Sequence, residues 1–209
     1  MAKNKILIFC AHSDDAEIGC GGTILKLRKE GNSIIHIVFS YGEKSHPHLK
    51  ERIVAVQREK ETKEIDKILS RKSLFLGLKE GKFKYDAEKT KKYLVDIIKK
   101  MKPAKIYTLS SLDPHPDHRA VNNLVMESIE TANYKGEVYA FEVWNVITED
   151  KPVLYSDVTD TFKEKLRLLK HFESQKLFIY IQLLPIIIRA RLYGNKCGCK
   201  YAEKFYKLK

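Results

Sequence analysis

The chain has 209 residues, 44% of them hydrophobic, which is enough for one well-buried core and predicts a single domain over 1–209. Its 39 Lys and Arg and 27 Asp and Glu give a formal net charge of +12, with the basic residues spread along the whole chain. Because no RNA- or DNA-binding signature accompanies this charge, it indicates a lysine-rich, solvated surface and excludes nucleic acid as the expected partner.

The first part of the chain alternates predicted strands and helices. A near-continuous apolar run over 5–11 is typical of a strand that is buried on both faces of a parallel sheet. A short helix and a second strand then complete a βαβ unit, and an amphipathic helix and a third strand follow. In chain order, these four elements are expected at 24–30, 33–39, 52–69 and 73–78.

The same alternation continues through the second half. The expected elements are a helix at 90–101, a strand at 105–110, a helix at 118–132, a strand at 138–146 and a helix at 160–172. Alternating strands and helices predict an α/β fold with three layers and a mostly parallel sheet. In such folds the connections are right-handed and ligands bind at the carboxyl ends of the strands.

An apolar stretch at 177–188 follows these elements. It is interrupted by Gln182 and Pro185 and is shorter than the ~20 residues that cross a bilayer, so no transmembrane segment is expected. A monomer of this size would hardly leave the stretch in water, which predicts a homo-oligomer. Contact of the stretch with another subunit and contact with a membrane both remain open.

Four cysteines are present: Cys10, Cys20, Cys197 and Cys199. They are too few and too unevenly placed for a disulfide framework, and Cys197 and Cys199 lack the spacing of a zinc knuckle. A reducing compartment fits this pattern, so a cytoplasmic location is expected.

The first motif with residues that could take part in catalysis or metal binding covers 11–23 and includes His12, Asp14 and Asp15. It lies where the first strand ends and a helix begins, which is where ligands bind in α/β folds. His12 and Asp15 are three residues apart, so in a tight turn both can reach one metal while Asp14 points toward a bound water. The glycines of the motif let the backbone approach closely.

The second motif, at 113–119, occupies the equivalent position after the fourth strand and includes His115, Asp117 and His118. Taken alone, each motif could be ordinary helix capping or turn chemistry. Two such loops would not usually both concentrate His and Asp at one sheet edge. Together they predict a His-Asp-His metal site with an open position for water, which a hydrolytic site requires.

These motifs resemble those of the LmbE-like or PIG-L-like de-N-acetylases, which remove acetyl groups from N-acetylglucosamine-containing molecules. That family has Ala-His-Pro-Asp-Asp followed by Gly-Gly-Thr, and a later His-Pro-Asp-His, on a Rossmann-like fold. Ser13 replaces the usual proline here, and Ala16 stands where some members have Glu, with Glu17 one position later. Further similarity is found at Arg58, Glu61, 157–160, 174–175 and 201–205.

The resemblance implies three metal ligands, His12, Asp15 and His118, with a water completing the site. Zn²⁺ is the expected metal, with Fe²⁺ or another divalent ion as the alternative. Asp14 then becomes the general base that takes a proton from the water. The expected partner is a small N-acetyl sugar.

The resemblance also implies roles for three residues outside the metal site. His115, oriented by Asp117, would be protonated and stabilise the tetrahedral oxyanion of the substrate. Arg58 would hold the substrate, although a solvated helix charge or a partner for Glu61 explains its presence equally well.

Three other functions compete with the deacetylase hypothesis. A nucleotide-binding module is suggested by 19–22, but G-x-G-x-x-G cannot be read there, and Asp14 and Asp15 would repel a pyrophosphate. A non-haem iron oxygenase uses the same kind of ligand set, but it has no use for a base at Asp14. A non-catalytic Rossmann-like family member is the third alternative, and the intact motifs argue against it.

Overall fold

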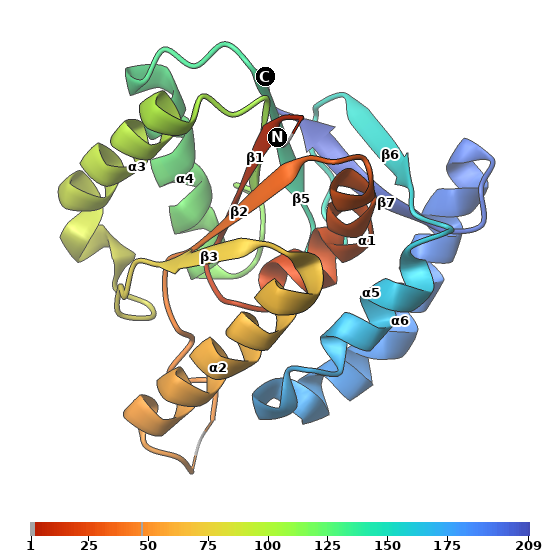
Figure 1. The fold of residues 1–209 in the computed structure, drawn as a ribbon, viewed down its shortest axis with the longest axis horizontal. Coiled ribbons are helices and arrows are strands. Elements are labelled where there is room, and N and C mark those ends of the chain that lie inside the picture. Colours follow the sequence, from red (N-terminus) through yellow and green to blue (C-terminus); the bar gives the residue numbers. More distant parts are fainter. Residues whose placement is uncertain (1–2, 47) are drawn as a thin grey trace.

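The protein forms one sheet of seven strands in the order β3-β2-β1-β4-β5-β7-β6 (Figure 1). This arrangement comes from a computed structural model that describes residues 3–46 and 48–209. The strands are β1 (Lys5–Cys10), β2 (Ser33–Val38), β3 (Lys72–Phe75), β4 (Lys105–Leu109), β5 (Glu137–Phe141), β6 (Val153–Asp157) and β7 (Ala202–Lys207). The α-helices are α1 (Asp15–Lys29), α2 (Glu51–Leu69), α3 (Ala87–Met101), α4 (Pro116–Thr131), α5 (Phe162–Leu169) and α6 (Lys176–Cys197).

The sheet is parallel from β3 through β5, and β7 runs antiparallel to both of its neighbours. The expected α/β fold with a mostly parallel sheet is confirmed. At the centre of the sheet, every residue of β1 after Lys5 is buried, because helices cover both faces of a parallel sheet. This explains the near-continuous apolar run in the sequence.

The helices form a layer on each side of the sheet. Figure 1 shows α3 and α4 on one side, while α1, α2 and α5 lie on the other. β1 and β4 are adjacent in the sheet, although the helix after β1 and the helix after β4 pack on opposite faces. Where neighbouring strands send their following helices to opposite faces of the sheet, a crevice forms at the carboxyl ends of the two strands. Both sequence motifs follow these two strands and therefore meet there.

Helix α1 begins at Asp15, earlier than expected, and is kinked at Cys20, whose φ of −138° is not helical. The backbone N–H groups of Gly22 and Thr23, just after the kink, donate to the carboxylate of Glu203 on β7. A carboxylate at this point acts as a cap for the second segment of the helix. The expected helix at 24–30 corresponds to this second segment, and the first segment carries the metal-site motif.

The sequence did not predict β6, β7 or the full extent of α6. β7 contains the charged residues Glu203 and Lys204, which suggest a solvated segment, yet both are buried. Glu203 pairs with Lys165, and Lys204 pairs with Glu142. Buried charges of this kind need such partners, and these partners are far away in the sequence.

Helix α6 is longer than the apolar stretch at 177–188 on which the exclusion of a membrane span was based. The segment Glu173–Cys197 has 25 residues and is long and apolar enough to cross a membrane by length and composition. The length of the helix therefore does not exclude a membrane span, although the shorter stretch at 177–188 was expected to do so. Only 28% of the most apolar window is buried in the protein, so α6 presents an apolar surface outward.

We expect Gly19→Ala to destabilise the fold by about 1–3 kcal/mol, the usual cost of overpacking a core. A Cβ at Gly19 would overlap the ring of Phe141 and would lie 2.5 Å from the carbonyl oxygen of Glu142. Gly21→Ala is the matched control, because the nearest atom to its Cβ would belong to the flexible side chain of Lys165 at 3.2 Å, and Glu17 Cβ at 3.8 Å is in ordinary contact. Urea unfolding measures both variants, and equal midpoints would contradict the proposed close approach of α1 to β5.

Candidate active site

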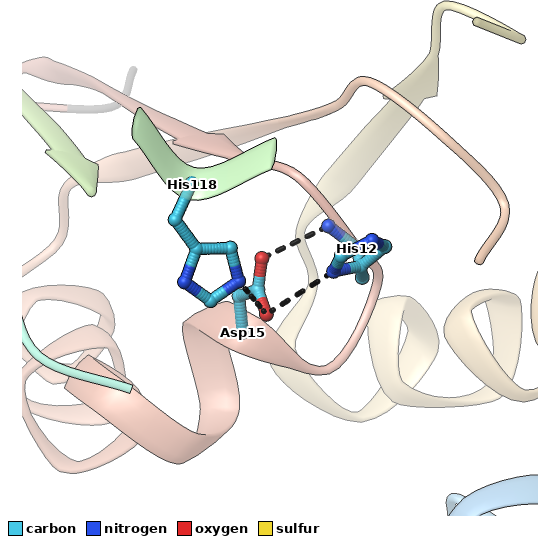
Figure 2. Close-up of side chains that lie close together, drawn as sticks. All are labelled: His12, Asp15 and His118. Atoms are coloured by element: carbon cyan, nitrogen blue, oxygen red, sulfur yellow. Dashed lines mark hydrogen bonds and ion pairs between the residues drawn. The ribbon is translucent and has the colours of Figure 1, made fainter. Parts of the chain in front are cut away.

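His12, Asp15 and His118 meet at the carboxyl ends of β1 and β4. Figure 2 shows the two imidazoles on either side of the Asp15 carboxylate. His118 Nε2 lies 3.4 Å from Asp15 Oδ1, and His12 Nδ1 lies 3.8 Å from the same oxygen. The backbone N–H of His12 donates to Asp15 Oδ2 at 2.9 Å, which fixes the orientation of the carboxylate.

These three side chains fit a divalent cation. Their ligand atoms lie within 4.8 Å of one another, and all three residues are buried. Among the described residues, His118 Nε2 is buried without a hydrogen-bond partner, and a buried polar atom in this state is costly unless something else satisfies it. Two imidazole nitrogens and one carboxylate oxygen are the donor set of zinc and ferrous sites.

The charge distribution also favours a cation. Burial opposes a charge on His118, but the carboxylates of Asp15 and Asp113 outweigh it and raise the pKa of His118 to about 10. Burial likewise opposes a charge on His12, and Asp117 and Asp15 raise its pKa to about 9. The field of these carboxylates thus stabilises positive charge at this point, and a metal ion would compete with protons for it.

Each histidine of the triad has a second carboxylate behind it. Asp113 Oδ2 lies 3.1 Å from His118 Nδ1, and Asp117 Oδ2 lies 3.6 Å from His12 Nε2. A carboxylate behind a ligating imidazole fixes its tautomer and orientation. The nitrogens left to bind a metal are therefore His118 Nε2 and His12 Nδ1, and both point toward Asp15.

The carboxylate of Asp117 contacts a different histidine from the one that the sequence predicted. It accepts the backbone N–H of Gly81 at 3.0 Å and faces His12, whereas the sequence predicted that it would orient His115. His115 Nδ1 instead accepts the backbone N–H of Asp117 at 3.2 Å. Residue 117 thus holds His115 through its main chain, because His115 is the N-cap of α4.

We expect Asp117→Asn to weaken metal binding about 10–100-fold, the usual effect of losing a carboxylate behind a ligating imidazole. The orientation of His115 should change little, because the backbone N–H that holds it is retained. Competition with a metal-sensitive chelating dye measures the affinity. Unchanged metal affinity together with a large loss of turnover would instead assign Asp117 to the chemical step.

Asp14 is held beside the triad by a buried ion pair. Arg58 Nη2 donates to Asp14 Oδ1 at 2.5 Å, and Arg58 is only 2% exposed. The other guanidinium nitrogens donate to Ser13 and Ser45, each at 3.3 Å. Arg58 is therefore neither a solvated helix charge nor a partner of Glu61, and it positions Asp14 while also lining the pocket.

His115 lies next to both imidazoles of the triad, with ring centroids 4.7 Å from His118 and 5.2 Å from His12. Burial and the charge of these two rings lower the pKa of His115, which favours the neutral imidazole over the protonated form expected from the sequence. Because Nδ1 accepts a hydrogen bond, the proton of the neutral ring is on Nε2. The ring can thus donate a hydrogen bond in its neutral form.

The sequence departures near Asp15 have structural explanations. Glu17 is fully buried and pairs with Arg71 in the core, so it does not replace the glutamate that some family members carry at the position of Ala16. Ser13 is buried and accepts the hydrogen bond from Arg58 Nε. The serine therefore supports the residue that positions Asp14.

A pocket of about 300 Å³ lies over the triad. It brings together six of the residues singled out in the sequence: His12, Asp14, Asp15, Arg58, His115 and His118. Sequence reasoning gave no site role to Glu80, Phe178 or Gln182, which also line it together with Trp144 and Gln175. The position of Glu80 after β3, at the same sheet edge, was the one available signal.

Residues 7–129 match the family described as PIG-L: GlcNAc-PI de-N-acetylase. The chain belongs to this family. The match covers both motifs and more than half of the chain. It agrees with the resemblance found in the sequence, and the pocket described above is the candidate site of this PIG-L chain.

Two relatives named as deacetylases cover most of this PIG-L chain. A diacetylchitobiose deacetylase from Thermococcus kodakarensis is 27% identical over 95% of this chain and 81% of its own length. The solved structure of an N,N'-diacetylchitobiose deacetylase from Pyrococcus horikoshii, in complex with an inhibitor, has a TM-score of 0.86. It is 27% identical and covers 98% of this chain and 84% of that chain.

The same fold also supports other chemistry. A 4-carboxy-2-hydroxymuconate hydratase from Pseudomonas putida matches with a TM-score of 0.85 at 20% identity, over 99% of this chain and 96% of that chain. The fold alone therefore does not decide the reaction. The reaction depends on the side chains that line the pocket.

Proposed function

We propose that this protein is a zinc-dependent hydrolase that removes the acetyl group from a small N-acetylglucosamine-containing molecule. The observation that carries the proposal is the buried triad of His12, Asp15 and His118 with Asp14 beside it in one pocket. Family membership and the named deacetylase relatives support the substrate class. A divalent cation at the triad supplies Lewis-acid polarisation and a water of lowered pKa.

Asp14 is the general base in this proposal. Its Oδ1 accepts a hydrogen bond from Arg58, so Oδ2 is the oxygen that takes a proton from water attacking the acetamide carbonyl. The ion pair fixes the direction of the carboxylate, which a general base requires. Asp14 then holds the proton near the leaving nitrogen of the sugar.

His115 lines the same pocket and donates its Nε2–H to the oxyanion that develops on the substrate. A positioned donor of this kind is worth ~3 kcal/mol in the transition state. The proton held on Asp14 returns to the nitrogen as the C–N bond breaks, which releases acetate and the free amine.

The pocket volume of about 300 Å³ is at the small end of ligand sites. It accommodates a sugar unit with its acetamide, and the rest of the substrate extends outward past Trp144 and Phe178. Both aromatic side chains line the pocket and offer an apolar face on which a sugar ring can stack. The protein therefore recognises the N-acetyl sugar in the pocket and the remainder of the molecule at its rim.

An acetate-release assay tests the proposal. Purified protein loaded with zinc, or with ferrous iron under anaerobic conditions, is incubated with N,N'-diacetylchitobiose and with N-acetylglucosaminyl inositol, free or phosphatidyl-linked. We expect acetate and a primary amine in equal amounts with at least one substrate, and none after chelation. Metal-loaded protein that hydrates an unsaturated carboxylic acid but releases no acetate would favour the hydratase chemistry of the structural relative.

A further inference from the structure

Helix α6 presents a continuous apolar face to the outside of the protein. Five of its residues recur every three or four positions and share that face, each 50–70% exposed: Leu177, Ile181, Leu184, Ile188 and Leu192. Phe178 and Tyr180 flank this row and are also more than half exposed. Exposed apolar patches of this extent on a soluble domain mark interaction sites.

The opposite side of the same helix is anchored to the domain. Ile179, Ile186, Ala190 and Tyr193 are buried, and α6 packs against β6 and β7. α6 therefore lies along the protein surface, and a span across a bilayer would require it to leave the domain. Its apolar face can instead enter the upper part of a lipid layer while the helix stays in the membrane plane.

The charges on this helix are of one sign. α6 contains Lys176, Arg189, Arg191 and Lys196 and no Asp or Glu, and the whole chain has a net charge of +12. Lys176 pairs with Glu173, just before the helix, at 3.1 Å, so the positive charge of the helix comes mainly from Arg189, Arg191 and Lys196. Basic residues beside an apolar helix face are attracted to anionic headgroups, by about 1 kcal/mol each near the surface. An anionic lipid surface complements both the apolar and the charged side chains of α6.

A second copy of the chain complements only the apolar part. The predicted homo-oligomer was based on this same segment, but pairing the face with itself would bring the basic residues of two α6 helices together, with no acidic residue on the helix to offset them. Like charges at an interface are unfavourable. The charge pattern therefore favours lipid over a second subunit.

We infer that the face of Leu177, Ile181, Leu184, Ile188 and Leu192 docks this protein on a lipid surface that carries anionic headgroups. Vesicle binding is independent of catalysis, so this inference does not depend on the proposed deacetylation.

The docking face is continuous with the rim of the pocket. Phe178 and Gln182 of α6 line the pocket over the triad. Leu177, Phe178 and Tyr180, together with Leu49, also line an adjoining, largely apolar groove of about 880 Å³. A protein docked through α6 therefore holds the mouth of its pocket at the lipid surface.

Vesicle sedimentation tests the inference with the intact protein. We expect binding to phosphatidylcholine vesicles that contain phosphatidylglycerol, weaker binding to pure phosphatidylcholine, and release from the anionic vesicles as salt is raised. Equal binding to both vesicle types at all salt concentrations would contradict the role of the basic residues. Absence of binding to either type would overturn the inference.

The double variant Ile181→Glu/Leu184→Glu tests the face itself. The two side chains are 61% and 64% exposed, so the fold should remain intact, and binding to the anionic vesicles should fall on the order of 100-fold or more. The matched control is Tyr85→Glu/Tyr93→Glu, two exposed aromatic residues of the α3 region on the other side of the sheet. Circular dichroism verifies folding, and Ile181→Gln/Leu184→Gln replaces the first variant if that variant does not fold.

Two outcomes would overturn the assignment. An equal loss of binding in the control and in the α6 variant would show attraction by net charge alone. A dimer seen by light scattering, which the α6 variant dissociates and which does not bind vesicles, would assign the face to a second copy of the chain.

Discussion

Replacing Asp14 by asparagine should lower kcat about 10²–10⁴-fold, the usual contribution of a general base, with little change in KM. Asparagine keeps the size of the side chain and an oxygen that can accept the hydrogen bond from Arg58 Nη2, but it cannot accept a proton from water. Metal content should remain close to that of the unchanged protein. Acetate release and elemental analysis on the same preparation measure the two quantities.

Asp15→Asn is the matched control for this result. Asp15 differs from Asp14 by one position, but its carboxylate lies between the two imidazoles of the triad. A neutral amide is a much weaker ligand than a carboxylate, so this variant should lose metal together with activity. Nearly full activity in Asp14→Asn, or metal loss as complete as in Asp15→Asn, would mean that the base lies elsewhere, with His115 the next residue to examine.

We expect His118→Ala to lower metal affinity by more than ~100-fold, beyond the effect of losing a group behind a ligand. His118 supplies the buried Nε2 that faces Asp15. Its removal would also leave Asp113 without the imidazole that lies 3.1 Å away. Elemental analysis after gentle purification, and titration of the apoprotein with zinc, measure the loss.

His115→Ala is the control in this second experiment. His115 lies beside His118, but it is the N-cap residue of α4 and is not part of the metal triad. This variant should therefore keep its metal and lose turnover. If both variants lose metal equally, the assignment of ligand and oxyanion donor within the second motif is wrong.

The position of the site could be predicted from the sequence because it depends on local patterns. The apolar run of β1 marks a buried strand, and the residues that follow such strands meet at one sheet edge. His12, Asp15 and His118 are indeed brought together. The alternation of strands and helices is also a local pattern, and it was sufficient to predict the α/β fold as far as β5.

The contacts that tune the site could not be predicted, because they join loops whose approach is set by tertiary packing. Glu80 and Gly81 approach His12 and Asp117 from the loop after β3. The sequence places this loop at the same sheet edge, but no local pattern indicates which of its residues reach the triad. The pairing of Arg58 with Asp14 crosses 44 positions. β7 was missed because its buried charges are neutralised by residues on other elements.

The insertion of β7 between β5 and β6 has a consequence for how the protein is made. During synthesis, β5 emerges from the ribosome well before residues 202–207, so its edge stays open until β7 arrives. The same strand brings Glu203 to Gly22, a contact across 181 positions, so the second half of α1 is capped late. Contacts this distant slow folding and leave an unpaired strand exposed. We therefore expect the nascent chain to depend on chaperones over this interval, and the pocket to be completed after most of the sheet has formed.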